Sequence, residues 1–165
     1  MHAVSDTSPL FNLAAINQLH LLPQFFEEIL IPDAVLQELE PVRKYPGVQE
    51  IHRAITEGSI VVATVRDRGR VHSLEQDLGS GEAEAITLAL ERGHPHVLID
   101  EREGSGVAEQ LGLKPMGVLG VLLRAKREGH LVSVKEMMTT LRDKVGFYIH
   151  RNLFLEVLRR AGEDS

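Results

Sequence analysis

The stretch HAVSDTSPLFNLAAINQ, residues 2–18, decides the fold of this chain. Its first part, HAVS at 2–5, reads as a short buried strand, and SPLFNLAAINQ at 8–18 has the apolar spacing of a helix. Asp6 stands between them, at the carboxyl end of the strand, with no Lys or Arg near it in the sequence. A strand that runs directly into a helix is typical of α/β proteins, and the carboxylate at the junction must be explained by the rest of the chain.

The pattern of strand followed by helix repeats along the chain. Apolar or β-branched runs predict further strands, and the spacing of apolar residues between them predicts helices. Such alternation produces a mostly parallel sheet with helices on both faces. The sequence therefore predicts an α/β fold, a three-layer α/β/α sandwich around a central, mostly parallel sheet of about five strands. Further strands are expected at 28–32, 60–65, 96–100 and from 114, helices at 33–40, 47–57, 81–93, within 101–113, 117–129, 133–146 and 151–162, and a largely irregular segment, helical in part, at 66–81.

The composition is that of a soluble globular protein. Of the 165 residues, 43% are hydrophobic and 25% are charged, which is enough apolar material for one core. The absence of Cys excludes disulfides and sites built on thiolates. We expect a single domain over 1–165, with 130–165 as a C-terminal helical extension. A cytoplasmic location is expected, because neither a signal peptide nor a membrane-spanning run is visible.

Two acids stand at the carboxyl ends of predicted strands. Asp6 follows the first strand, and Asp100 closes the run HVLID at 96–100. Parallel strands end at the same edge of a sheet, and ligands of such folds bind beyond that edge. We therefore expect the two carboxylates to lie on one side of the molecule.

Helical geometry selects two more acids. Because each residue turns a helix by about 100°, Glu82 falls on the apolar side of 81–93, while Glu84 points roughly opposite, toward solvent. The same count places Glu38 on the apolar side of 33–40. The sequence thus predicts that two helices each direct one carboxylate inward, near a helix end.

Each of these acids also has a purely structural explanation. Asp6 could cap the helix that follows it, as could Ser8, and Asp100 could cap the helix that comes after it. An acid near a helix N-terminus, such as Glu82, is favoured by the helix dipole. The convergence of four inward acids from four elements favours a functional site, because carboxylates brought together repel each other and a hard divalent ion relieves that repulsion.

Several segments together resemble the PIN-domain proteins, in the bacterial and archaeal branch related to the VapC ribonuclease toxins. The resemblance implies a PIN-like sandwich for nearly the whole chain. It rests on SDTSPLFNLA at 5–14, IPDAVLQELE at 31–40, LGSGEAEAITLALERG at 78–93 and VLIDERE at 97–103, and continues through VAEQLGL and MGVLGVLLRAKREG.

The resemblance also implies the catalytic residues. The acidic quartet of the family falls on Asp6, Glu38, Glu82 and Asp100. In PIN nucleases of this kind, Mg²⁺ or Mn²⁺ would be bound by Asp6, Glu82 and Asp100, with Glu38 as a direct or water-mediated ligand. Carboxylates suit this role because hard oxygen ligands hold Mg²⁺ while leaving some of its waters in place.

Accessory residues follow from the same resemblance. The hydroxyl of Thr7 or Ser8 would orient a water or a phosphate oxygen, although for Ser8 a helix cap is an equal alternative. The third family acid is often Asp in the toxins, so Glu84 stands as a substitute for Glu82. Apart from the resemblance, the charge cluster Arg66, Arg68 and Arg70, with Arg102, could supply positive charge for the RNA backbone, and a plain solvated surface is the alternative for such a cluster.

The function implied by the resemblance is a metal-dependent ribonuclease that hydrolyses phosphodiester bonds. The resemblance also allows the protein to be the toxin of a toxin–antitoxin pair. The expected partners are RNA, an antitoxin protein and a second copy of the chain, and no association with a membrane is expected. The alternative is a PIN-like module that has lost catalysis and binds nucleic acid or protein. The net charge of −6 favours the alternative, because it argues against broad neutralisation of phosphates, whereas the four retained acids oppose it.

Overall fold

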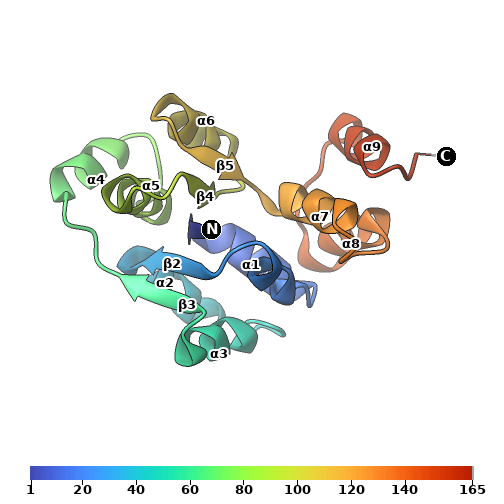
Figure 1. Cartoon of the computed structure of the whole chain (residues 1–165), viewed down its shortest axis with the longest axis horizontal. Coiled ribbons are helices and arrows are strands. Elements are labelled where there is room, and N and C mark those ends of the chain that lie inside the picture. Colours follow the sequence, from blue (N-terminus) through green and yellow to red (C-terminus); the bar gives the residue numbers. More distant parts are fainter. Residues whose placement is uncertain (165) are drawn as a thin grey trace.

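The computed structural model describes residues 1–164 and contains one five-stranded sheet (Figure 1). Its strand order is β3-β2-β1-β4-β5, and all four pairings are parallel. The predicted parallel sheet is therefore confirmed, and the first strand of the chain lies at its centre. The strands are β1 (His2–Ser5), β2 (Glu28–Pro32), β3 (Ile60–Ala63), β4 (His96–Leu98) and β5 (Lys114–Met116).

Helices connect the strands and follow the last of them. The segment 66–81 is more regular than predicted, because Asp67 accepts a hydrogen bond from the Arg70 backbone N–H at 3.0 Å and so caps a helix there. The helices are α1 (Thr7–Ala15), α2 (Asp33–Leu39), α3 (Gln49–Glu57), α4 (Arg68–Leu74), α5 (Ser80–Arg92), α6 (Arg102–Gln110), α7 (Val118–Arg127), α8 (Val134–Thr140) and α9 (Arg151–Arg160), with short helical turns at Leu19–Gln24, Glu40–Val42 and Leu141–Val145.

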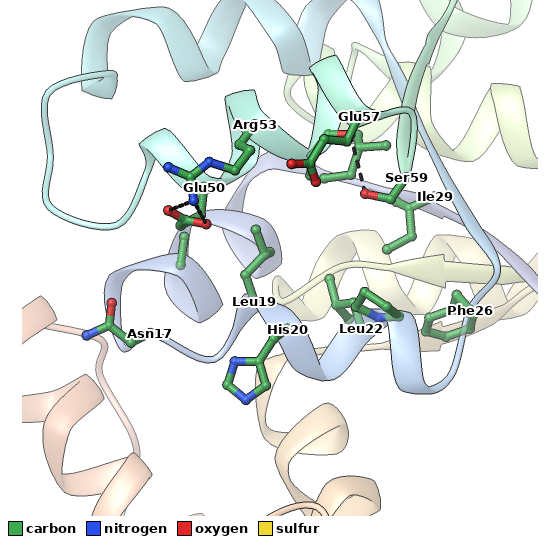
Figure 2. A pocket seen from close by; sticks show the side chains of 14 residues that line it. Asn17, Leu19, His20, Leu22, Phe26, Ile29, Glu50, Arg53, Glu57 and Ser59 are labelled. Atoms are coloured by element: carbon green, nitrogen blue, oxygen red, sulfur yellow. Dashed lines mark hydrogen bonds and ion pairs between the residues drawn. The ribbon is translucent and has the colours of Figure 1, made fainter.

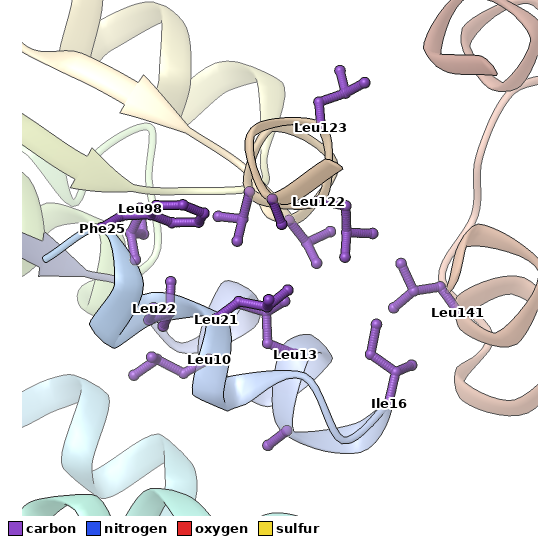
Figure 3. Close-up of a cluster of buried hydrophobic side chains, with 14 of the residues drawn as sticks. Leu10, Leu13, Ile16, Leu21, Leu22, Phe25, Leu98, Leu122, Leu123 and Leu141 are labelled. Carbon is purple, nitrogen blue, oxygen red and sulfur yellow. The ribbon is translucent and has the colours of Figure 1, made fainter. Parts of the chain in front are cut away.

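The two faces of the sheet are covered by different helices, because successive strand residues point to opposite sides. Ala3 and Leu98 face a core that includes Leu10 of α1 and Leu122 of α7 (Figure 3). Val4 and Val97, their neighbours in sequence, face a second core built with α4, α5 and α6. Helices on both faces of one sheet make the three-layer α/β/α sandwich that the sequence predicts.

The last helices gather at one end of the molecule. Figure 1 shows α7, α8 and α9 side by side there, in orange to red. Met138, Leu141 and Val157 are buried in the core that α1 and α7 share, so the C-terminal segment is helical and packs on the body. Within residues 1–164, no helix has the length and apolar character needed to cross a membrane.

Candidate active site

A cavity of about 410 Å³ opens at the carboxyl edge of the sheet. The ends of β1 and β4 meet the first turns of α1 and α5 there. Three of the four predicted catalytic acids line the cavity, and Asp100 does not. The lining consists of Asp6, Thr7, Ser8, Phe11, Glu38, Val42, Gly79, Gly81, Glu82 and Glu101.

Asp6 is buried at the centre of this edge, with 6% of its surface exposed. It stands at the N-cap position of α1, but its side chain makes no capping hydrogen bond, so the helix-cap explanation fails. Burial is the largest cause that raises the pKa of Asp6 to about 7; the Thr7 backbone N–H lowers it, and the charges of Glu82, Glu38 and Asp100 raise it further.

The approach of α5 to this carboxylate depends on Gly81. A Cβ atom at Gly81 would lie 2.8 Å from Asp6 Oδ1 and 2.7 Å from Glu38 Oε2, which is closer than real Cβ contacts. A larger residue at this position would therefore push these two carboxylates away from the first turn of the helix.

Glu82 lies in the first turn of α5 with 8% of its surface exposed. Its Oε1 accepts a long hydrogen bond from the Gly79 backbone N–H at 3.4 Å. Its Oε2 is buried without any hydrogen-bond partner. Burial is the main cause that raises the pKa of Glu82, and the charge of Glu101 is the second. A buried carboxylate oxygen without a partner is costly, and this one lies against Gly104 of α6, where a Cβ atom would collide with it.

Glu38 stands at the rim of the cavity and is solvent-exposed. The prediction that it points inward is therefore wrong: the helical count gave the correct side of α2, but that side opens onto the cavity instead of the core. Thr7 Oγ1 donates to Glu38 Oε2 at 3.0 Å. The Thr7 hydroxyl thus holds the rim carboxylate in position from the first residue of α1.

Asp100 is held in a hydrogen-bond network next to the cavity. Its Oδ2 accepts from Ser8 Oγ at 3.0 Å and from Asn12 Nδ2 at 3.1 Å, and its Oδ1 accepts from the Val118 backbone N–H at 2.6 Å. Burial still raises its pKa, although these three hydrogen bonds lower it. Asp100 therefore joins α1 to the start of α7. It does not cap α6, and Ser8 is its partner and not a helix cap.

Glu101 is a site residue that the sequence analysis missed. It occupies the N-cap position of α6 without a side-chain cap, is exposed, and lines the cavity beside Glu82. The signal was available, since an acid directly after Asp100 must point to a different side of the extended backbone. Which of the two faces the cavity depends on the packing of α1 and α7, which the sequence pattern does not contain.

Glu84 is buried, with 7% of its surface exposed, so the prediction that it faces solvent is wrong. Its Oε1 accepts from the Ala34 backbone N–H at 3.1 Å, and its Oε2 pairs with Arg68 at 3.1 Å. The helix α5 packs against the sheet, α2 and α4 at once, so every side of its first turns is covered. Glu84 does not line the cavity, and its contacts anchor the start of α2.

Replacing Glu84 by Ala should lower the free energy of unfolding by about 1–3 kcal/mol, because the buried Ala34 N–H loses its acceptor. Urea denaturation measures this difference. The matched control is Glu109→Ala, which removes an exposed acid from α6. If Glu84→Ala lowers the free energy of unfolding no more than the control does, this contact does not stabilise α2.

The four arginines predicted to contact RNA do not line the acidic cavity. Arg68 pairs with Glu84, and Arg70 lies 3.7 Å from Asp67 on its own helix. The remaining two are Arg66, which lines a separate surface hollow, and Arg102, which is exposed at the start of α6. Their contact with RNA stays a prediction.

A second cavity of similar volume, about 420 Å³, lies at the opposite edge of the sheet (Figure 2). Leu19, Leu22 and Phe26 form part of its apolar floor, and the charged residues at its rim include Glu50 and Arg53, which pair with each other at 3.1 Å. It is remote from the strand ends that carry the acids, and it gathers no set of unpaired carboxylates. The acidic cavity is therefore the candidate active site.

The donors of the acidic cavity fit a hard divalent cation. Its four acids supply carboxylate oxygens, the ligand type that Mg²⁺ and Mn²⁺ prefer. The buried Oε2 of Glu82 has no hydrogen-bond partner, and Gly81 lets the carboxylates of Asp6 and Glu38 lie against the first turn of α5. Across residues 1–164, no three His, Asp or Glu side chains already stand close enough together to form a ligand group. The carboxylates surround the cavity from separate elements instead.

Comparison with known families agrees with this architecture. A family model described as a PIN domain matches residues 2–163, nearly the whole chain. Neither the curated proteins nor the solved structures contain a match. The parallel sheet, the acids at its carboxyl edge and this match lead to one conclusion: the chain belongs to the PIN-domain family.

Proposed function

We propose that this protein is a metal-dependent endoribonuclease that hydrolyses phosphodiester bonds in RNA. PIN domains are generally nucleases, and typically use divalent metals. One observation in this chain supports the proposal most directly. Glu82, whose Oε2 is buried without a hydrogen-bond partner, and the buried Asp6 line one cavity together with Glu38 and Glu101.

The residues divide into two groups under this proposal. Asp6, Glu82 and Glu101 would hold Mg²⁺ or Mn²⁺, with Glu38 at the rim as a direct or water-mediated ligand. Asp100 becomes a positioning residue, because its oxygens already accept three hydrogen bonds. A bound divalent ion lowers the pKa of its water and offsets negative charge on the phosphate. Thr7 keeps the rim carboxylate turned to the cavity.

Cleavage of RNA in the presence and absence of metal tests the proposal. Wild-type protein is incubated with a pool of labelled RNAs in Mn²⁺, in Mg²⁺ and in EDTA. We expect cleavage with either ion and none in EDTA. Glu101→Gln should reduce the cleavage rate at least about tenfold, since it removes one charge from the cavity, whereas Glu109→Gln on the same helix should leave it unchanged.

Calorimetric titration with Mn²⁺ shows whether the protein binds the ion, whatever the result of the cleavage assay. Metal-independent cleavage, or equal effects of the two Glu→Gln variants, would contradict the assigned site. Metal binding without cleavage of any RNA would contradict the ribonuclease and favour the catalytically inactive binding module. The toxin role, an antitoxin partner, a homodimer and the cytoplasmic location stay predictions. Growth arrest when the protein is expressed, and its relief in the Glu101→Gln variant, would support the toxin role.

A further inference from the structure

The second cavity, lined by α3 and by the turn Leu19–Gln24, takes no part in the proposed reaction. Its volume of about 420 Å³ is that of a site for a small organic molecule. Its floor is made of apolar side chains that each expose at most 3% of their surface: Leu22, Phe26, Ile29 and Ile60. Such side chains lack contacts on the side of the cavity, and a ligand with an apolar body would supply them.

One side of α3 forms the wall that faces this floor. Its residues in the cavity follow the spacing i, i+3, i+4 and i+7, which places them on one side of a helix: Glu50, Arg53, Ala54 and Glu57. Figure 2 shows Glu57 on the side opposite Leu22 and Phe26. A helix normally packs an apolar side on a floor of this kind. Here that side carries three charged residues and one small one, so the side chains of α3 do not fill the space above the floor.

The charges on this side of α3 do not balance. Arg53 pairs with Glu50 at 3.1 Å, whereas Glu57 is exposed and has no ion-pair partner within residues 1–164. Glu57 is also the last residue of α3, where the helix dipole is negative and disfavours a carboxylate. The carboxylate and the helix end therefore both attract a cation to the rim of the second cavity.

We infer that the second cavity binds a small organic cation with one apolar chain, the chain lying on the floor and the cation beside Glu57. A neutral molecule of the same length would gain only the apolar contacts. An anion of the same length would be repelled by Glu57 and by the negative end of α3. The site is separate from the acidic cavity and does not depend on the proposed ribonuclease function.

The test is a calorimetric titration with probes that have the same chain and different head groups: octylammonium, octanol and octanoate. Mg²⁺ is present throughout, so that it competes with octylammonium for the acidic cavity. We expect octylammonium to bind at a single saturable site, about tenfold more tightly than octanoate, because Glu57 and the helix end attract one head group and repel the other. Octanol should bind with an affinity between these two.

Two variants separate the contribution of the charge from that of the space. Glu57→Arg changes an exposed residue and should reverse the order, so that octanoate binds more tightly than octylammonium. Ala54→Leu places a larger side chain in the cavity and should weaken the binding of every probe at least about tenfold. Glu109→Arg on α6 is the matched control, because it reverses the charge of an exposed acid outside the cavity, and it should keep the wild-type order.

Three results would overturn the inference. The first is equal affinity of wild type for all probes, or an unchanged order in Glu57→Arg. The second is the absence of saturable binding of any probe. The third is binding of octylammonium that Asp6→Asn removes and Glu57→Arg leaves unchanged, which would place the cation in the acidic cavity. None of these measurements uses RNA, so the result stands whether or not the protein is a ribonuclease.

Discussion

Replacing Asp6 by Asn should reduce the rate of RNA cleavage by about 1,000-fold or more while leaving the protein folded. Asn has nearly the same shape but carries no charge, so the cavity loses the buried carboxylate that lies against Gly81 and lines the cavity with Glu82. Charge stabilisation by a catalytic ion is worth several kcal/mol, and about 4 kcal/mol corresponds to three orders of magnitude in rate.

Single-turnover cleavage in saturating Mn²⁺ measures this loss directly. Asp77→Asn is the control, because Asp77 is exposed and lies outside the cavity. It should cleave at the wild-type rate. A folded Asp6→Asn protein that keeps more than about a tenth of the wild-type rate would place the reaction centre elsewhere.

Much of the fold could be predicted because its signals are local. The segment 2–18 contains a strand and a helix whose periodicities are visible without any partner, and the structure has β1 and α1 there. The same holds for the strand at 28–32, whose bounds agree residue for residue. The segment 66–81 is where the prediction was least complete, because α4 is set by the Asp67 cap and by packing on α5 instead of by a long apolar stripe.

The site was harder to predict because it depends on which side of an element meets which neighbour. Glu82 was selected correctly, since the apolar side of α5 does face the interior. Glu84 was assigned to solvent because the helical count assumes one covered side, whereas residues 81–89 of α5 are buried on every side. Asp100 and Glu101 are neighbours in the sequence, but only Glu101 lines the cavity. Asp100 is turned away from it by three hydrogen-bond donors from α1 and α7.

The second large effect concerns stability and pH. In metal-free buffer, the free energy of unfolding of Asp6→Asn should exceed that of wild type by about 4 kcal/mol at pH 8, and the two should be nearly equal at pH 4. The pKa of Asp6 rises from an ordinary 3.8 to about 7 on folding. Between these values the folded protein binds more protons than the unfolded chain, so stability falls as the pH rises. Asn cannot ionise, and the variant escapes that loss.

Comparing the two proteins at each pH isolates Asp6, together with the acids coupled to it, from the titrating groups elsewhere in the chain. Burial also raises the pKa of Glu82 and Asp100, which lowers stability in the same direction as the pH rises, and it lowers the pKa of His94 and His96, which acts in the opposite direction. The histidine contributions are common to both proteins and cancel in the difference, whereas Glu82 and Asp100 are coupled to the charge of Asp6, so the change in their titration is part of the measured difference. Urea denaturation from pH 4 to pH 8 provides the measurement. A difference that does not change with pH would show that Asp6 ionises as readily in the folded protein as in the unfolded chain. Added Mn²⁺ at pH 8 should then stabilise wild type more than Asp6→Asn, because the ion offsets the same repulsion that the substitution removes.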